Sequence, residues 1–341
     1  MSGSFSAVDF ALSADQLALR DAARELLDGR SPIGVARTAM DGGGRPDLEL
    51  WSAMVDQGWC GIAVPEALGG IGLGWVEAAL LIEEVGAHVS PAPILSQLVA
   101  LDLLADTAWG PGLLSGEITA AVTDDLSSPV PYAPTADVVV AIEVDALVAF
   151  ELDESPVIEA AMDLTRPLGF VSGGRHGVAV IGDGDAARRF GDLGAIAYSA
   201  ELLGLAQRAL DMSVDYARER VQFGKPIGSF QAIKHRCADM LVDVEGMRSA
   251  VWWAAWCLTA RHDDASVAAS TAKIWCSDAA TRVLSSAMQV HGGIGFTWEH
   301  DLHLYLKRAH LDTLAFGTAT SHRQRLAAIL RDRVATGGSV I

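Results

Sequence analysis

From Asp192 to the end of the chain, apolar residues recur every three or four positions in four successive stretches. Such a period places one apolar stripe along a helix, so four long helices are predicted. Short turns separate them, which favours an antiparallel four-helix bundle. The stripes are Ile196, Ala200, Leu203, Ala206, Leu210, Val214 and Ala217; then Ile233, Cys237, Met240, Val244, Met247, Val251, Ala254 and Leu258; then Val267, Ile274, Thr281, Leu284 and Met288; and Leu326 to Leu330.

The first part of the chain is also predicted to be helical. A helix over 10–30 has Ser13 as N-cap and Gln16 three residues later, which is the spacing of a capping box. Further helices are expected over 48–57, 76–86 and 96–104. The glycine-rich stretch 68–74 between them has neither Walker nor GxGxxG order, so its glycines are predicted to allow close backbone packing.

The pattern changes between residues 118 and 190. Short β-branched apolar runs at 137–142, 146–150 and 177–181 are separated by Pro, Gly and Asp, as in strands. The predicted fold is therefore mainly α, with three parts: an N-terminal helical domain (1–117), a reduced middle β-domain (118–190) and a C-terminal four-helix bundle (191–341).

Composition excludes several classes of protein. The chain has 25 Lys and Arg against 43 Asp and Glu, a net charge of −18, which argues against nucleic acid or an anionic membrane as main partner. The four cysteines lack metal-site or disulfide spacing, so no metal is expected, and those in the helical stretches are predicted to be small buried hydrophobes. With no signal-like start and no long apolar run, a cytoplasmic protein is expected.

The corner between the first two bundle helices, 220–231, contains charged and aromatic residues that a simple turn does not need. Pro226 is expected to end the first helix, and Gly224 to permit an unusual backbone conformation. Arg220 offers donors suited to a phosphate, while Phe223 and Phe230 offer flat apolar faces. This set suits a dinucleotide; the alternative is an ordinary corner with a surface arginine and two core phenylalanines.

Two more blocks lie at later corners of the bundle. Gln289 precedes Gly292 and Gly293, a pair that ends the third helix and exposes backbone N–H groups. Gly317 and Thr318 lead into the last helix, whose N-terminal donors suit an anion.

In this order, the three blocks resemble the acyl-CoA dehydrogenases, flavoenzymes with N-terminal helices, a middle β-domain and a C-terminal four-helix bundle. Arg-x-x-Phe-Gly followed by Phe-Gln at 220–231, Gln-x-x-Gly-Gly-x-Gly at 289–295 and Gly-Thr at 317–318 match the family's motifs. The N-terminal stretches 58–66, 69–70 and 83–86 fit as well. The stretch ending at 321–323 resembles actinobacterial paired subunits that dehydrogenate steroid side-chain CoA thioesters.

The resemblance implies an FAD shared between subunits. Arg220 would pair with the FAD pyrophosphate, and Gly317 and Thr318 would close over FAD next to the catalytic base. The residues implied to line the adenosine half are Phe223, Gln231, Gln289, Gly292 and Gly293. The family removes an α-proton from an acyl thioester while a β-hydride passes to the flavin, and its carboxylate base contributes roughly 10²–10⁴-fold in rate.

Here the chain departs from the family. The usual base position holds Phe316, and the alternative position, near the start of the first bundle helix, falls near Gly194. Asp192 and Glu201 lie within two turns of it as weak candidates, although a surface or capping role for Glu201 is the favoured interpretation. The stretch 121–129 also lacks the Gly-Ser-Asp sequence with which relatives hold the flavin ring.

These departures predict a non-catalytic subunit of a heteromer, with α2β2 as the expected form, in which a sibling subunit supplies the base and the flavin-ring pocket. The complex would dehydrogenate an acyl-CoA, for which a steroid side chain is the guess, and pass electrons to an electron-transfer flavoprotein. Two alternatives stay open: a self-sufficient dehydrogenase using Glu201 or Asp192, and a structural protein without flavin.

Overall fold

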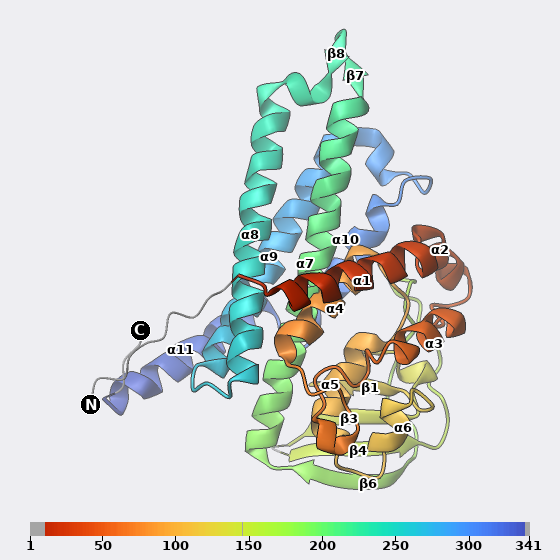
Figure 1. Cartoon of the computed structure of the whole chain (residues 1–341), viewed down its shortest axis with the longest axis vertical. Helices are drawn as coiled ribbons and strands as arrows, with labels where there is room; N and C mark the ends of the chain where they lie inside the picture. The colour runs from red at the N-terminus through yellow and green to blue at the C-terminus, as the bar shows by residue number, and fades with distance from the viewer. Residues whose placement is uncertain (1–10, 145, 338–341) are drawn as a thin grey trace.

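The computed structural model describes residues 11–144 and 146–337, in which a helical bundle stands above a small sheet (Figure 1). Three long helices form the bundle: α7 (Gly184–Glu219), α8 (Gln231–Thr259) and α9 (Ala265–His291). The shorter α10 (Leu302–Leu314) packs against α7 and α9, and α11 (Ala319–Ala335) packs against α9. The predicted bundle is therefore present, with α10 as an additional helix.

The N-terminal helices are α1 (Ala14–Arg30), α2 (Ile33–Asp41), α3 (Leu48–Asp56), α4 (Trp75–Ala87), α5 (Ile94–Leu104) and α6 (Gly110–Leu114). The Ser13–Gln16 capping box is confirmed, since each side chain bonds the other residue's backbone N–H. The sequence analysis missed α2, which follows Pro32 and has no side-chain cap, and the five-residue α6, which is too short to show a full apolar period. Close packing of the glycine-rich loop is confirmed at Gly70, where a Cβ atom would lie 2.1 Å from the Val64 carbonyl oxygen.

The middle segment forms a four-stranded sheet in the order β1-β3-β4-β6. Its strands are β1 (Ala120–Thr123), β3 (Val138–Glu143), β4 (Ala146–Leu152) and β6 (Arg175–Gly182). Strand β1 runs parallel to β3, and the other pairs are antiparallel. A separate two-stranded ladder joins β2 (Val130–Pro131) to β5 (Leu168–Gly169).

The main core runs from the helices into the sheet, and a smaller apolar cluster that includes Val139 and Phe150 is separate from it. Val122 and Val140 share the main core with residues of α4, α5 and the bundle, so the middle segment is not packed as an independent body. Asp183 caps the start of α7 by accepting from the Asp185 and Ala186 amides, and the predicted boundary at residues 190/191 lies inside this 36-residue helix. The helix was predicted to begin near 192 because its first turns carry no apolar stripe.

Cysteines and tryptophans match expectations in part. All four cysteines are free; Cys257 and Cys276 are buried as predicted, whereas Cys237 is only half-buried. The tryptophans at helical spacing in the bundle, at 252, 253, 256 and 275, would be expected in the core, but the Trp275 side chain is 40% exposed. Within the two described ranges, no helix is long and apolar enough to cross a membrane, and no group of three or more His, Cys, Asp or Glu could hold a metal.

Candidate functional site

The first corner of the bundle is a β-hairpin at the tip of the molecule (Figure 1). Helix α7 ends at Glu219, so the prediction that Pro226 ends it was wrong. Strands β7 (Val221–Gln222) and β8 (Lys225–Pro226) pair antiparallel, and Phe223 and Gly224 both have positive φ, at 55° and 76°. Two left-handed residues between paired strands are typical of the tightest hairpin turns.

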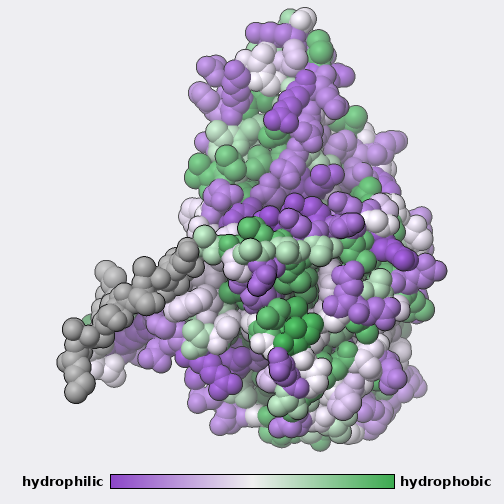
Figure 2. Space-filling view, in the orientation of Figure 1, coloured by the Kyte–Doolittle hydropathy of each residue, from purple (hydrophilic) through white to green (hydrophobic). Residues whose placement is uncertain are grey.

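The hairpin projects its side chains into solvent. Phe223 is 91% exposed, and Phe230 is partly exposed, with the two rings in edge-to-face contact at 6.1 Å. The interpretation of these residues as core phenylalanines was therefore wrong. The Lys225 Nζ lies 4.4 Å from the Phe230 ring centroid, and Arg220 is exposed with no ion pair to any described residue. Figure 2 shows apolar and polar side chains mixed at this tip.

The second sequence block lies beside the first. The His291 ring, at the end of α9, stacks on Tyr216 near the end of α7, with 4.6 Å between ring centroids. Gly292 ends α9 with φ +63°, as predicted, and a Cβ atom on it or on Gly293 would meet nothing within 4 Å. Gln289 is exposed on the last turn of the helix. An exposed arginine, aromatic rings and open glycine backbone are thus gathered at one end of the bundle.

The third block lies at the opposite end. Phe316 contacts α7 at Gly194, 26 positions before Arg220, which corresponds to roughly 39 Å along a helix. Gly317 has φ +85°, and Thr318 caps α11 by accepting from the Ser321 amide. The predicted FAD-contacting residues therefore form two groups, and the separation exceeds the length of an extended dinucleotide.

The two positions at which the family resemblance implied a catalytic base, Phe316 and Gly194, are in contact in this chain, and neither residue has a carboxylate. The Phe316 ring is 3% exposed and packs directly on Gly194, where a Cβ atom would lie 2.0 Å from a ring carbon. Phe190 meets the same ring edge-to-face at 5.1 Å, and Tyr198 lies at 5.7 Å. An apolar aromatic cluster thus fills the place where the family resemblance implied a base.

Glu201 is held in a buried ion network. Its carboxylate accepts from Arg308 Nη1 at 2.8 Å and Arg166 Nη1 at 3.2 Å, and the side chain is 1% exposed. Burial opposes its ionisation, but the two guanidinium groups prevail and hold the pKa of Glu201 below its usual value. The favoured surface or capping role was therefore wrong, and a carboxylate held by two arginines is poorly suited to accept a proton from a ligand.

Asp192 is also paired. Its carboxylate accepts from Ser266 Oγ at 2.6 Å and forms an ion pair with Arg325 at 2.7 Å. It is 3% exposed and is not among the residues that line the two largest cavities described below. The structure thus brings neither candidate base into an open cavity.

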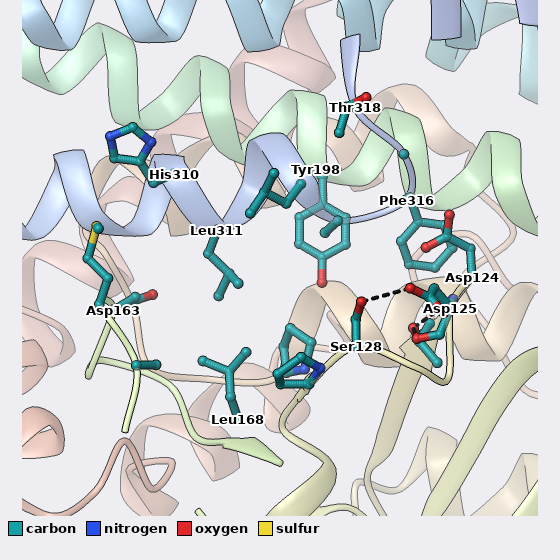
Figure 3. Close-up of a pocket in the computed structure, with 18 of the residues that line it drawn as sticks. Asp124, Asp125, Ser128, Asp163, Leu168, Tyr198, His310, Leu311, Phe316 and Thr318 are labelled. Carbon is teal, nitrogen blue, oxygen red and sulfur yellow. Dashed lines mark hydrogen bonds between the residues drawn. The ribbon is translucent and has the colours of Figure 1, made fainter. Parts of the chain in front are cut away.

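A cavity of about 610 Å³ lies between the loop after β1, the segment 159–163 and the junction of α10 with α11 (Figure 3). Phe316, Gly317 and Thr318 line one end of it, together with Asp124 and Asp125. A smaller cavity of about 450 Å³ lies on the other side of Phe316 and also includes Asp124. The third sequence block therefore borders a cavity that residues of this chain line.

The sequence analysis missed the buried charges that support this cavity. Asp163 accepts from Arg308 Nε at 2.7 Å, and Arg166 bonds Asp312 from the other side. Burial raises the pKa of the Asp312 carboxyl well above its usual value. Burial also lowers the pKa of Lys273, whose Nζ donates to the Asp312 carbonyl, to about 8. These residues come from distant segments, so no local spacing could have indicated the network.

The two ends differ in how well they fit FAD. At the tip, the exposed Arg220 and the unobstructed Gly292 and Gly293 backbone fit an anionic group joined to an aromatic one. At the cavity, the loop after β1 presents two carboxylates, Asp124 and Asp125, where a flavin ring would need hydrogen-bond donors and small residues. The residues of the tip fit the adenosine half, and those of the cavity do not fit the flavin ring.

The chain belongs to the acyl-CoA dehydrogenase family, and this membership indicates an oxidoreductase. Residues 13–108 match the family model of the acyl-CoA dehydrogenase N-terminal domain, and residues 183–330 match that of the C-terminal domain. Acyl-CoA dehydrogenase IpdE2 of Mycolicibacterium smegmatis is 33% identical over 324 residues, covering 93% of this chain and 99% of the relative. Acyl-CoA dehydrogenase FadE27 of Mycobacterium tuberculosis is 32% identical, over 83% of this chain and 88% of the relative.

Solved structures agree on the fold. A chain of the ChsE4–ChsE5 complex from Mycobacterium tuberculosis superposes with a TM-score of 0.85 at 27% identity, covering 95% of this chain and 99% of that one. Butyryl-CoA dehydrogenase from Megasphaera elsdenii superposes with a TM-score of 0.78 at 23% identity, over 94% and 99% of the chains. The predicted family and fold class are confirmed.

Proposed function

We propose that this chain is the non-catalytic subunit of a heteromeric, FAD-dependent acyl-CoA dehydrogenase. Its bundle tip contributes the adenosine half of an FAD site whose flavin-ring half belongs to a sibling subunit. The sibling also supplies the carboxylate base. The complex catalyses α,β-dehydrogenation of an acyl-CoA thioester, and α2β2 is the expected assembly.

The observation that carries this proposal is the separation of the two groups of predicted FAD contacts. Arg220 and Phe223 are exposed at the tip, roughly 39 Å along α7 from Phe316. A dinucleotide bound at the tip must therefore extend into another subunit. At the other end, Phe316 packed on Gly194 leaves both family base positions without a proton acceptor.

Relatives support pairing with a different chain. The solved neighbour with a TM-score of 0.85 is described as a complex of two proteins, ChsE4 and ChsE5. Another, at 27% identity and a TM-score of 0.84, is described as the Tcur3481–Tcur3483 steroid acyl-CoA dehydrogenase. These descriptions favour a heteromer and a bulky, steroid-derived acyl group. The electron acceptor of the complex is an electron-transfer flavoprotein, as the family resemblance implies.

This chain's own residues have a binding role in the proposed reaction. Bound FAD supplies the hydride-accepting chemistry. Arg220 pairs with the pyrophosphate, while Phe223, Gln231 and Gln289 line the adenosine. The open backbone of Gly292 lets the cofactor approach closely.

The test is a visible spectrum of the chain purified alone and after co-purification with a sibling acyl-CoA dehydrogenase. We expect a colourless single chain and a yellow complex with one FAD for every two subunits. A yellow homomer with one FAD per chain would overturn the proposal. It would make Asp192→Asn and Glu201→Gln the next variants to assay. A colourless chain with every candidate sibling would favour the structural protein without flavin.

A further inference from the structure

We propose that the cavity of about 610 Å³ is a ligand site of this chain itself, for an apolar molecule with a hydroxyl at one end and a carboxylate or similar anion at the other. This goes beyond the proposed function, because the cavity lies at the end of the bundle away from the tip and needs no flavin. The ligand's hydroxyl faces Asp124, and its anionic end faces Lys307 and His310.

The middle of the cavity accounts for an apolar ligand body. Its wall consists mainly of aliphatic and aromatic side chains from five separate segments, namely Val122, Pro129, Pro131, Ala160, Ala161, Met162, Leu168, Leu311, Leu314 and Phe316. The volume is within the range of small-molecule sites, about 300–1,000 Å³. Binding an apolar body there removes water from surfaces that cannot hydrogen-bond with it.

One end of the cavity presents a hydrogen-bond acceptor. Asp124 borders both cavities that flank Phe316 (Figure 3), and no described cation lies within ion-pair distance of its carboxylate. Burial raises the pKa of Asp124, although its own amide, the charge of Lys273 and the Phe316 amide counteract the rise. Asp124 is half-buried, and a carboxylate without an ion partner in such a place is stabilised by a ligand that donates a hydrogen bond.

The neighbouring carboxylate does not compete for this role. Both Asp125 oxygens already accept from hydroxyls, Ser127 Oγ at 2.6 Å and Ser128 Oγ at 2.7 Å. These bonds hold the pKa of Asp125 below its usual value. Asp125 therefore provides a matched control next to Asp124.

Two basic side chains, Lys307 and His310, line the other end of the cavity, and the exposed carboxylate of Glu159 belongs to the same lining. His310 lies across the cavity from Asp124 in Figure 3, and Lys307, one helical turn earlier on α10, also lines the wall. Lys307 has no ion pair with a described residue; its Nζ lies 4.1 Å from the Trp298 ring centroid. Asp163, at the same end, is already paired with Arg308 and so does not repel an anion strongly.

The direct test is isothermal titration calorimetry of the full chain with three probes of equal length: 10-hydroxydecanoate, decanoate and methyl 10-hydroxydecanoate. We expect the hydroxy acid to bind about tenfold more tightly than decanoate, as a hydrogen bond to a carboxylate allows. It should bind about two- to fivefold more tightly than the methyl ester, since the pair with Lys307 is partly solvated.

Single substitutions test which residue at each end of the cavity recognises which group of the ligand. Asp124→Leu should make 10-hydroxydecanoate bind no more tightly than decanoate. Lys307→Gln should make 10-hydroxydecanoate bind no more tightly than its methyl ester. Asp125→Asn should retain both differences in affinity. Ala161→Trp should block all three probes by filling the cavity. If Asp124→Leu does not fold, Asp124→Asn should reduce the hydroxyl preference about two- to fivefold.

Equal affinity for 10-hydroxydecanoate and decanoate, no binding of any probe, or binding that survives Ala161→Trp would each overturn the inference. None of these results bears on the FAD content of the complex. The visible spectrum decides that question separately.

Discussion

The polar groups at the two ends of the bundle differ in their burial and in how they are paired. At the cavity end, charges such as Arg308 and Glu201 are completely buried and paired with each other. At the tip, Arg220 and Phe223 are exposed and have few partners within the chain. Removing a charge at the cavity end should therefore affect stability, whereas removing one at the tip should affect only what binds there.

The largest expected effect is at the buried network. Arg308→Ala leaves Asp163 and Glu201 buried with one cation fewer, and we expect a loss of about 3–5 kcal/mol in the free energy of unfolding. Urea denaturation measures it. Arg188→Ala is the control, because its pair with Asp185 is exposed and should contribute less than about 1 kcal/mol. Similar losses for both variants would contradict the contrast between buried and exposed charges.

The pH dependence of stability tests the buried Lys273. Burial lowers its pKa to about 8 in the folded protein, against 10.5 when unperturbed. Between these values the unfolded state binds more protons than the folded state, so stability should rise with pH. We expect Lys273 to contribute about 2–3 kcal/mol to the rise between pH 8 and pH 10.

Denaturation of the wild type and of Lys273→Met across this range isolates the contribution. The difference between the two proteins should vary with pH. A difference that stays constant would show that the lysine keeps its ordinary pKa.

A third effect concerns the contact between Gly194 and Phe316. Gly194→Ala places a Cβ atom 2.0 Å from a carbon of the Phe316 ring, and we expect a loss of about 1–3 kcal/mol in stability. Gly191→Ala on the same helix meets nothing within 4 Å and should stabilise by up to about 1 kcal/mol.

The double variant Gly194→Ala/Phe316→Leu sharpens this test. If contact with the Phe316 ring causes the loss of stability, Gly194→Ala should lower the free energy of unfolding less than half as much in the Phe316→Leu protein as in the wild type. An undiminished cost would place the strain elsewhere on α7.

The smallest effect is expected at the tip. Arg220→Gln should weaken FAD binding by the complex about tenfold, through the loss of a charge-assisted hydrogen bond, without changing the stability of the chain. Equilibrium dialysis with flavin fluorescence measures the affinity. Arg218→Gln is the matched control, since that exposed arginine pairs with Asp215 within its own helix. A loss of stability with Arg220→Gln would indicate a structural role instead.

The sequence by itself determined the local structure. The apolar stripes predicted the long helices of the bundle, Ser13 and Gln16 predicted the first cap, and Gly224, Gly292 and the Gly-Thr turn marked the corners. These features depend on residues a few positions apart, whose preferences act wherever the segment lies. The order of three such corners was also enough to indicate the family.

Only the tertiary structure decided what the side chains do. Glu201 could be assigned to a surface or capping role until Arg166 and Arg308, 35 residues before it and 107 after it, were brought into contact. In the same way, packing of Phe316 on Gly194 formed an aromatic wall where the family resemblance implied a base, and left Asp124 facing a cavity. Burial and charge pairing depend on residues far apart in the chain, so no local pattern records them.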